Sequence, residues 1–187
     1  MTTRPADNTP VVLLDEDHHP IGQLPKSQVH HGETPLHRGF SCYVFDGSGR
    51  VLMTRRAISK KTWPGVWSNT CCGHPLPGES DTDAATRRLA DELGLRLTRP
   101  EVILPDFRYR AVAPDGVVEN EFCPVLVANA EGEPDPDPTE VVEFHWAPWP
   151  AVVTLATTTP WLISPWSAAQ IPLLAARLSP RYTSVTG

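Results

Sequence analysis

The chain has 187 residues, a length that fits one domain better than several. Its 16 Lys and Arg against 22 Asp and Glu give a formal charge of −6, so general electrostatic binding to nucleic acid or to an anionic membrane surface is not expected. Apolar residues make up 40% of the chain, which is enough for a sizeable core, and 21 prolines disfavour a helical bundle. No stretch approaches the roughly 20 apolar residues that cross a bilayer. We expect a protein without nucleic-acid or membrane partners.

The cysteines and the N-terminal segment favour a cytoplasmic location. Cys42, Cys71, Cys72 and Cys123 form no CxxC pair, and adjacent cysteines are a poor framework for the disulfides of a secreted domain. The first ten residues are polar and contain no apolar region typical of a signal peptide. We therefore expect reduced thiols and a cytoplasmic protein.

The first part of the chain predicts two β-hairpins. Residues 11–14 form a short apolar run, and residues 22–24 fit its hairpin partner after a turn. Residues 40–45 are aromatic and β-branched, and the Asp-Gly-Ser-Gly turn at 46–49 leads to a partner strand at 51–54.

The clearest helix is expected over residues 80–94. Ser80 with Asp83 three residues later resembles a capping box, and Gly94 is a natural residue for ending a helix. Apolar residues spaced four apart give this helix one buried face. The apolar stripe consists of Ala85, Leu89 and Leu93.

The second half alternates strands with short helices. An acidic, proline-rich loop is expected at 131–139, and Asp115-Gly116 fits a tight turn between two strands. Strands outnumber the scattered helices, which indicates a mixed α and β class. The expected strands are 102–104, 107–113, 117–122, 125–130 and 141–146, and the expected helices are 148–156 and 167–178, the second interrupted by Pro172.

A set of histidines and carboxylates predicts a divalent metal site. His30, His37 and His74 lie in polar segments. Glu119 and Glu121 are two residues apart on a predicted strand, so their carboxylates project from one face. Three imidazoles and two carboxylates suit a transition ion such as zinc or manganese. The alternative is a set of exposed polar residues with no common role.

Two alternatives stay open for this set. His31 directly follows His30, and either residue could be the ligand, because an extended segment would turn them to opposite sides. A histidine set could also belong to a structural zinc domain or to a non-catalytic ligand sensor.

Residues 73–95 carry a spaced pattern that resembles the Nudix box, the loop–helix–loop that binds diphosphate and magnesium in Nudix hydrolases. A helix with carboxylates along one flank can present oxygen ligands to Mg²⁺, which bridges phosphate oxygens. Arg88 and Asp91 stand where the box normally has Glu, which weakens the case for a hydrolase. An ordinary solvated amphipathic helix is the alternative. The matching positions are Gly73, Glu79, Arg87, Leu89, Glu92, Gly94 and Leu95.

A local concentration of positive charge in this acidic protein fits an anionic substrate. Residues 54–61 read TRRAISKK. Arg can bind a phosphate through two hydrogen bonds, and Lys adds a point charge. A solvated surface is the alternative interpretation. The basic set is Lys26, Arg55, Arg56, Lys60, Lys61 and Arg88.

One thiol and several aromatic side chains complete the candidates. Cys72 lies next to Gly73 and close to His74, and it could donate or accept a proton with a pKa set by nearby cations. Trp has the strongest π-face for holding a cation, although Trp166 taken alone favours a packing role. The aromatic candidates are Trp67, Tyr109 and Trp166.

Taken together, these sets resemble the type I isopentenyl-diphosphate isomerases, Nudix-fold proteins that isomerise rather than hydrolyse. The resemblance runs from about residue 11 to residue 166, and several independent blocks occur in the right order. The blocks are LHRGFS at 36–41, TRRAISKKTWPGVW at 54–67, SNTCCGHP at 68–75, DFRYRA at 106–111, ENE at 119–121 and SPW at 164–166.

The resemblance implies an α+β fold, a Nudix-like α/β/α sandwich with a mixed central β-sheet. It implies a single isomerase domain over residues 11–180, between a flexible N-terminal tail at 1–10 and a C-terminal tail at 181–187. We expect a monomer that acts on a small isoprenoid diphosphate.

The resemblance also implies a role for each site residue. Cys72 and Glu121 correspond to the two proton-transfer groups, with Tyr109 assisting. Glu92 corresponds to the carboxylate that binds Mg²⁺ together with the substrate diphosphate, and Trp166 to the aromatic residue that faces the allylic cation. The transition metal, Mn²⁺ or Zn²⁺, would bind His30, His37, His74, Glu119 and Glu121, and the diphosphate would contact Lys26, Arg56, Lys60 and Arg88.

The implied activity interconverts isopentenyl diphosphate and dimethylallyl diphosphate in isoprenoid biosynthesis. Protonation of the terminal alkene carbon gives a tertiary carbocation, and loss of a proton from C2 gives the other isomer. The chemistry requires an acid and a base on opposite sides of a flat apolar group. A Nudix-type diphosphate hydrolase is the alternative function.

Overall fold

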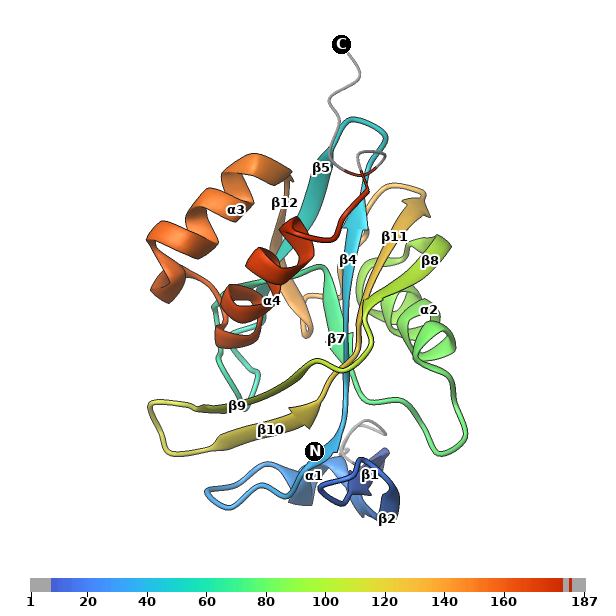
Figure 1. The fold of residues 1–187 in the computed structure, drawn as a ribbon, viewed down its shortest axis with the longest axis vertical. Coiled ribbons are helices and arrows are strands. Elements are labelled where there is room, and N and C mark those ends of the chain that lie inside the picture. Colours follow the sequence, from blue (N-terminus) through green and yellow to red (C-terminus); the bar gives the residue numbers. More distant parts are fainter. Residues whose placement is uncertain (1–7, 180–181, 183–187) are drawn as a thin grey trace.

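The computed structural model describes residues 8–179 and residue 182 (Figure 1). The tails expected at 1–10 and 181–187 lie largely outside these residues. Pro10 begins the first strand, and Tyr182 is buried, with its ring centroid 5.5 Å from that of Phe45. These two residues of the expected tails therefore pack against the folded domain.

A seven-stranded mixed sheet forms the middle of the molecule. At its centre, β4 (Phe40–Phe45) and β11 (Val125–Glu131) pair in parallel, and the other pairs are antiparallel. The predicted second hairpin is confirmed, because β4 pairs with β5 (Arg50–Arg56) at Phe45 and Val51. The main strands lie in the order β12 (Val141–Pro148), β5, β4, β11 and β8 (Arg96–Leu104), with β6 (Trp67–Ser68) beside β5 and β7 (Cys71–Gly73) beside β4.

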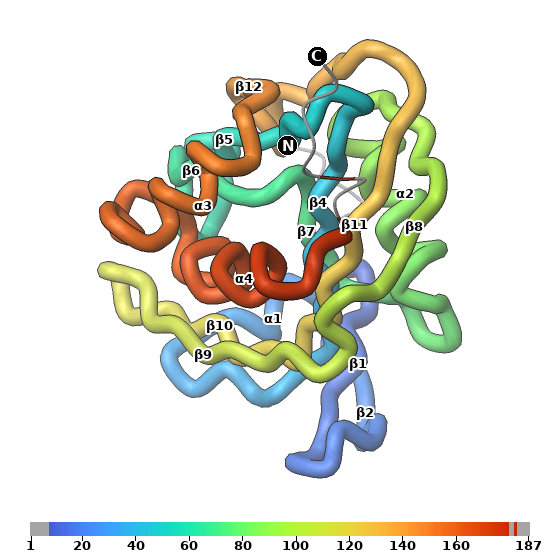
Figure 2. The backbone as a smooth tube through the Cα atoms, turned by 45° about the horizontal axis from the view of Figure 1, so that its top comes forward, coloured from blue at the N-terminus to red at the C-terminus, as the bar shows by residue number. Residues whose placement is uncertain are grey.

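Helices cover both faces of this sheet. α2 (Asp81–Leu93) lies on one face, and α3 (Trp149–Thr158) and α4 (Pro165–Ala175) lie on the other, with the 3-10 turn η2 (Pro160–Leu162) between them (Figures 1 and 2). Because side chains alternate along a strand, β4 buries one set of side chains with α2 and the other with α3 and α4. The predicted α/β/α sandwich with a mixed central sheet is confirmed. Among the described residues, no helix is long and apolar enough to cross a membrane.

A five-stranded sheet lies at the lower end of the larger sheet in Figure 1. It contains the predicted hairpin at the start of the chain and a second hairpin closed by the turn at Asp115-Gly116. The short helix α1 (Lys26–Val29) follows the first hairpin. The strands lie in the order β2 (Pro20–Pro25), β1 (Pro10–Leu14), β3 (His37–Arg38), β10 (Val118–Phe122) and β9 (Arg108–Val112).

Two neighbouring parallel strands pass from the smaller sheet into the larger one. β3 continues through Gly39 into β4, and β10 continues through Cys123 and Pro124 into β11. Hydrogen bonds carry the pairing across this junction. The Gly39 N–H donates to the Phe122 carbonyl at 2.9 Å, and the Ser41 N–H donates to the Pro124 carbonyl at 3.0 Å. The two sheets are therefore fixed relative to each other by continuous backbone.

The sequence signals at the two ends of α2 are confirmed. Ser80 accepts a hydrogen bond from the Asp83 backbone N–H at 3.1 Å, which satisfies one of the free donors of the first turn. Gly94 takes a left-handed φ of 65°, and its N–H donates to the Ala90 carbonyl. The predicted apolar stripe, including Leu89, is fully buried against the larger sheet.

The structure differs from the sequence-based expectation in its short elements and at one proline. The sequence does not predict α1, β3, β6 and β7, because two to four residues show no hydrophobic period. α4 runs through Pro172, where an interruption is expected. The neighbouring Ile171 and Leu174 are fully buried, and this burial offsets the backbone hydrogen bond that proline removes.

We expect Leu89→Ala to lower the free energy of unfolding by about 2–5 kcal/mol, because the truncation leaves a cavity between α2 and the sheet. Urea unfolding followed by circular dichroism measures the change. Thr86→Ala, at an exposed position of the same helix, is the matched control and should change the value by less than about 0.5 kcal/mol. Equal losses in the two variants would contradict this packing.

Candidate active site

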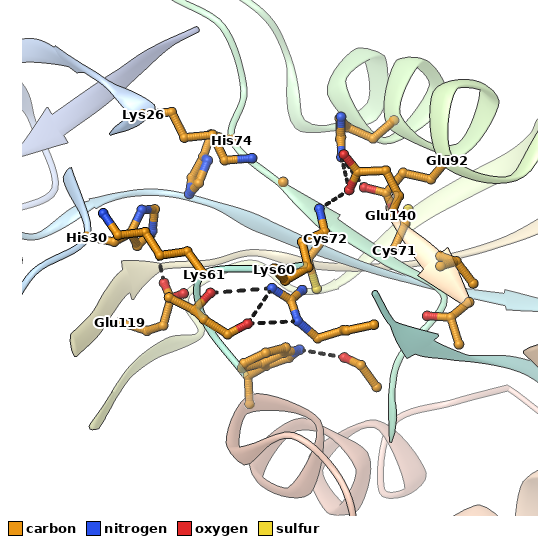
Figure 3. A pocket seen from close by; sticks show the side chains of 18 of the residues that line it. Lys26, His30, Lys60, Lys61, Cys71, Cys72, His74, Glu92, Glu119 and Glu140 are labelled. Carbon is orange, nitrogen blue, oxygen red and sulfur yellow. Dashed lines mark hydrogen bonds and ion pairs between the residues drawn. The ribbon is translucent and has the colours of Figure 1, made fainter. Parts of the chain in front are cut away.

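A cavity of about 520 Å³ is lined by residues of both sheets, α1 and α2. Figure 3 shows side chains from these elements gathered around it. Of the residues to which the family resemblance gives a role, only His37 does not line the cavity; it is fully buried, with Nε2 3.4 Å from Oε1 of Glu121. The further candidates Arg55 and Trp67 lie outside the cavity, where Arg55 pairs with Glu143 and the Trp67 ring lies 5.5 Å from that of His145. The expected residues that line the cavity are Lys26, His30, Arg56, Lys60, Cys72, His74, Arg88, Glu92, Tyr109, Glu119, Glu121 and Trp166.

Metal-ligating atoms converge on one side of this cavity. Oε1 of Glu121 lies 3.4 Å from Nε2 of His37 and 3.3 Å from Nε2 of His74. Oε2 of Glu119 lies 3.2 Å from Nε2 of His30. The residues whose ligand atoms all lie within 4.8 Å of one another are His30, His37, His74 and Glu121.

The donor set fits a divalent transition ion. Nε2 of His37 and Oε2 of Glu119 are buried and find no hydrogen-bond partner among the described residues, so a cation would satisfy both atoms. Nδ1 of His37 lies 2.9 Å from the Pro35 carbonyl, which can only accept. Nδ1 therefore carries the hydrogen and turns Nε2 towards the cluster, as in many metal-ligating histidines.

Two members of the cluster have the protonation states of metal ligands. Burial lowers the pKa of His74 to about 3, so its imidazole is neutral. Burial opposes ionisation of Glu121, but the adjacent imidazoles of His37 and His74 hold the pKa of its carboxyl well below the usual value. Burial also opposes protonation of His37, but its contact with Glu121 raises its pKa above the usual value. Metal binding requires neutral imidazoles and ionised carboxylates, so the states of His74 and Glu121 favour it, and a bound ion would take the place of the proton on His37.

Gly39 makes room for the Glu121 carboxylate. A Cβ atom at residue 39 would lie 2.4 Å from Oε2 and 2.8 Å from Cδ of Glu121, far inside van der Waals contact. The position where β3 passes into β4 is thus also the position where the carboxylate approaches the backbone.

Two proton-bearing groups face the same cavity as Glu121. Burial raises the pKa of the Cys72 thiol to about 12, and hydrogen bonds with Ser41 and Asn69 only partly offset this effect. Burial, followed by the charges of Glu121 and Glu119, raises the pKa of Tyr109 well above its usual value. Both groups therefore keep their protons at neutral pH.

Cations line the side of the cavity next to α2. Arg88 forms ion pairs with Glu92 and, at 3.3 Å, with Glu140. Burial lowers the pKa of Lys60 to about 7, and burial together with the charge of Arg88 lowers the pKa of Lys26. Such a concentration of buried positive charge gives an anionic ligand a favourable place to bind.

Trp166 forms one wall of the cavity and is held rigidly. Its indole Nε1–H donates to Oδ1 of Asn69 at 2.9 Å and lies 3.0 Å from Oγ of Ser68. The guanidinium carbon of Arg56 lies 5.4 Å from its ring centroid, and the Tyr109 ring lies 6.0 Å away. The ring is therefore fixed in place, with the guanidinium of Arg56 already in a cation–π contact with it.

The geometry separates the neighbouring residues that the sequence leaves open. His31 is exposed and its Nδ1 accepts the Glu33 backbone N–H, whereas His30 lies in the ligand cluster. Cys71 reaches the cavity but belongs to the apolar core beneath α2. Asp91 is exposed, whereas Glu92 is buried at the cavity.

Three polar residues of the site are missed by sequence reasoning. Asn69 contacts both the Cys72 thiol, at 3.1 Å, and the Trp166 indole. Ser41 lies 3.5 Å from Sγ of Cys72, and Glu140 lines the cavity beside the cations. Asn69 and Ser41 lie within motif blocks, which could have indicated them. Glu140 ends a proline-rich loop and carries no local signal.

Comparison with known proteins places the chain in a family. A NUDIX domain model matches residues 35–169. The chain is 58% identical over 166 residues to an isopentenyl-diphosphate Delta-isomerase of Mycolicibacterium vanbaalenii, covering 89% of this chain and 91% of that protein. It is 56% identical over 161 residues to an isopentenyl-diphosphate Delta-isomerase of Frankia alni, covering 86% and 83% of the two chains.

Structural comparison supports the fold at larger evolutionary distance. The crystal structure of DR0079 from Deinococcus radiodurans aligns with a TM-score of 0.66 at 16% identity, covering 87% of this chain and 97% of that one. The chain belongs to the NUDIX proteins and, within them, to the isopentenyl-diphosphate Delta-isomerase family.

We expect Gly39→Ala to lower the affinity for a divalent transition metal by about 10- to 100-fold, because the new methyl group displaces the Glu121 carboxylate. Titration with Zn²⁺ or Mn²⁺, with circular dichroism as a check on folding, measures the loss. Gly22→Ala is the matched control, since a Cβ there meets no atom within 4 Å. Unchanged metal affinity in folded Gly39→Ala would contradict this account of the cluster.

Proposed function

We propose that this protein interconverts isopentenyl diphosphate and dimethylallyl diphosphate, with Cys72 and Glu121 as its two proton-transfer groups. The observation that carries the assignment of these groups is their placement. Cys72 comes from β7 of the larger sheet and Glu121 from β10 of the smaller sheet, and both line one cavity. A five-carbon group held between them would have an acid and a base at hand on different sides.

The protonation states supply one donor and one acceptor. Cys72 keeps its proton and Glu121 is ionised. One group adds a proton to the terminal carbon of the double bond, and the other removes a proton from C2, so no proton is gained or lost overall. Tyr109, paired with Glu121 across β9 and β10, supplies a hydroxyl that keeps its proton beside the carboxylate.

The intermediate of this reaction is a tertiary carbocation, which needs stabilisation without water. The Trp166 face offers a cation–π contact, and its two hydrogen bonds keep the ring from turning away. As part of the cavity lining, this ring also helps to exclude water that would otherwise reach the cation.

The cations anchor the diphosphate away from the reacting carbons. Lys26, Arg56, Lys60 and Arg88 line the cavity together with Glu92. We propose Glu92 as a ligand of Mg²⁺ bound with the substrate diphosphate, since hard carboxylate oxygens suit this ion. Binding energy from the phosphates then orients the alkene between the proton-transfer groups.

We propose that the histidine cluster and Glu119 and Glu121 hold Mn²⁺ or Zn²⁺. Such an ion, when bound, would place positive charge beside Glu121 and would fix its orientation. The structure favours no choice between the two ions, because imidazole and carboxylate ligands accept both.

Features of the site disfavour the alternative of diphosphate hydrolysis. Arg88 pairs with Glu92, whereas Asp91 is exposed to solvent and does not line the cavity. The helix thus presents one carboxylate and one guanidinium to the cavity, which suits holding phosphate more than activating water for attack on it.

The direct test is incubation of the metal-replete protein with isopentenyl diphosphate and Mg²⁺, followed by chromatography of the products. Cys72→Ala and Glu121→Gln should each lower kcat by at least about 10²-fold, because each removes one proton-transfer group. Cys71→Ala is the matched control and should retain most activity. Near-full activity of Cys72→Ala or Glu121→Gln would contradict the assignment, and an absence of dimethylallyl diphosphate with the wild-type protein would contradict the function.

A further inference from the structure

Glu140 is a largely buried carboxylate at the cavity, and the proposed mechanism gives it no role. Only 13% of its side chain is exposed, and a buried carboxylate is costly unless it is paired. Its Oε2 pairs with Nζ of Lys60 and lies 3.3 Å from Nη2 of Arg88. One carboxylate oxygen thus contacts two of the four cations proposed to bind diphosphate.

The backbone around Glu140 joins the elements that carry these two cations. The Ala57 N–H donates to the Glu140 carbonyl at 2.9 Å, and the Lys60 N–H donates to the Ala57 carbonyl at 3.1 Å, so Glu140 is tied to the turn that presents Lys60. Three residues earlier, the Asp137 N–H donates to the Glu92 carbonyl on α2 at 2.9 Å. Glu140 therefore lies where three segments meet, namely the start of β12, the turn that follows β5, and the helix α2.

Long basic side chains bind an anion well only when their orientation is fixed in advance. Lys60 and Arg88 each have several rotatable bonds, and immobilising these bonds on ligand binding costs conformational entropy. The cations of this cavity also repel one another, which favours spreading them apart. A carboxylate between two of these cations fixes their orientation and offsets their mutual repulsion before the ligand binds.

We propose that Glu140 is a positioning residue of the diphosphate site, whose carboxylate holds Lys60 and Arg88 in the orientation that receives the phosphates. The identity of the substrate rests on the proposed isomerase function. Glu140 itself acts through the two cations and not through contact with the reacting carbons.

The test compares Glu140→Gln with the wild-type protein in KM and kcat for isopentenyl diphosphate and in Kd for inorganic pyrophosphate with Mg²⁺. KM and Kd should rise about tenfold while kcat changes less than about threefold, because the amide keeps the shape but loses the charge-assisted hydrogen bonds. Glu140→Asp, which keeps the charge on a shorter stem, should fall between the two proteins.

Glu143→Gln is the matched control. Glu143 lies in β12, three residues after Glu140, and it also pairs with an arginine, Arg55, at 3.3 Å, but its side chain is 43% exposed and does not line the cavity. Its KM, kcat and pyrophosphate Kd should stay at wild-type values. A general effect of removing a carboxylate from this part of the chain would instead appear in both variants.

A double-mutant cycle with Lys60→Ala tests whether Glu140 acts through its partner. Glu140→Gln should weaken pyrophosphate binding less in the Lys60→Ala background than in the wild-type background, because part of its effect runs through Lys60. Equal weakening in both backgrounds would contradict positioning of Lys60.

Pyrophosphate binding that is unchanged or tighter in Glu140→Gln would overturn the proposal, as would a lower unfolding temperature with unchanged KM. Should Glu140→Gln fail to fold, Glu140→Asp carries the test, and an unchanged KM there overturns the proposal. The two hypotheses remain distinguishable. A lack of turnover by the wild-type protein contradicts the proposed function, whereas pyrophosphate binding reports on Glu140 without any turnover.

Discussion

The continuous segment that runs from β3 through Gly39 into β4 holds the two sides of the cavity in register. His37, at its start, lies opposite Glu121 in the smaller sheet, and Ser41, four residues later, lies opposite Cys72 in the larger one. The separation between the proposed proton-transfer groups is therefore set by backbone pairing and not by side-chain flexibility. Four extended residues separate the two pairs by on the order of 13 Å of backbone. Because the side chains of Glu121 and Cys72 both reach into the cavity, the gap between their functional groups can match the width of a small substrate. Gly39 lies between the two pairs and leaves space for the Glu121 carboxylate.

The cavity has two electrostatically different regions, one lined by basic side chains and one by the proposed proton-transfer groups. The protein as a whole is acidic and has 16 basic residues. The four of them that are expected to bind phosphate all line this one cavity. On another side, burial keeps Cys72 and Tyr109 protonated, while the adjacent imidazoles of His37 and His74 keep Glu121 ionised. Arg88 shows how a single residue on α2 can alter the ligands that a NUDIX fold presents to its cavity. A guanidinium lies on α2 where the resemblance to the Nudix box predicts a carboxylate, and we expect it to add phosphate affinity in place of a metal ligand.

Sequence reasoning succeeds where a physical signal is local or where a motif is long. The caps and apolar stripe of α2 are readable because a helix repeats every few residues, and the hairpins are readable from alternating side chains and turn glycines. The α/β/α arrangement and the set of residues around the cavity follow from the family resemblance, since spacing alone cannot bring His30, His74 and Glu121 together. Elements of two to four residues, such as α1 with Lys26, contain too little pattern to be predicted.

Sequence reasoning does not find the residues whose roles depend on contacts between segments that lie far apart in the chain. Glu140 lies 80 residues from Lys60 in the chain, and the pairing of β12 with β5 brings the two charges together. Asn69 joins the Cys72 thiol to the Trp166 indole across 97 residues. α4 continues through Pro172 because burial on both sides of that residue outweighs its local preference.

The central claim is that hydrogen moves across the five-carbon group while the diphosphate stays intact. Incubation with isopentenyl diphosphate and Mg²⁺ in deuterium oxide, read by proton and phosphorus NMR on the same sample, tests it most directly. The account predicts dimethylallyl diphosphate with deuterium in its new methyl group and unchanged diphosphate signals. Release of monophosphate, or product without deuterium, would contradict it.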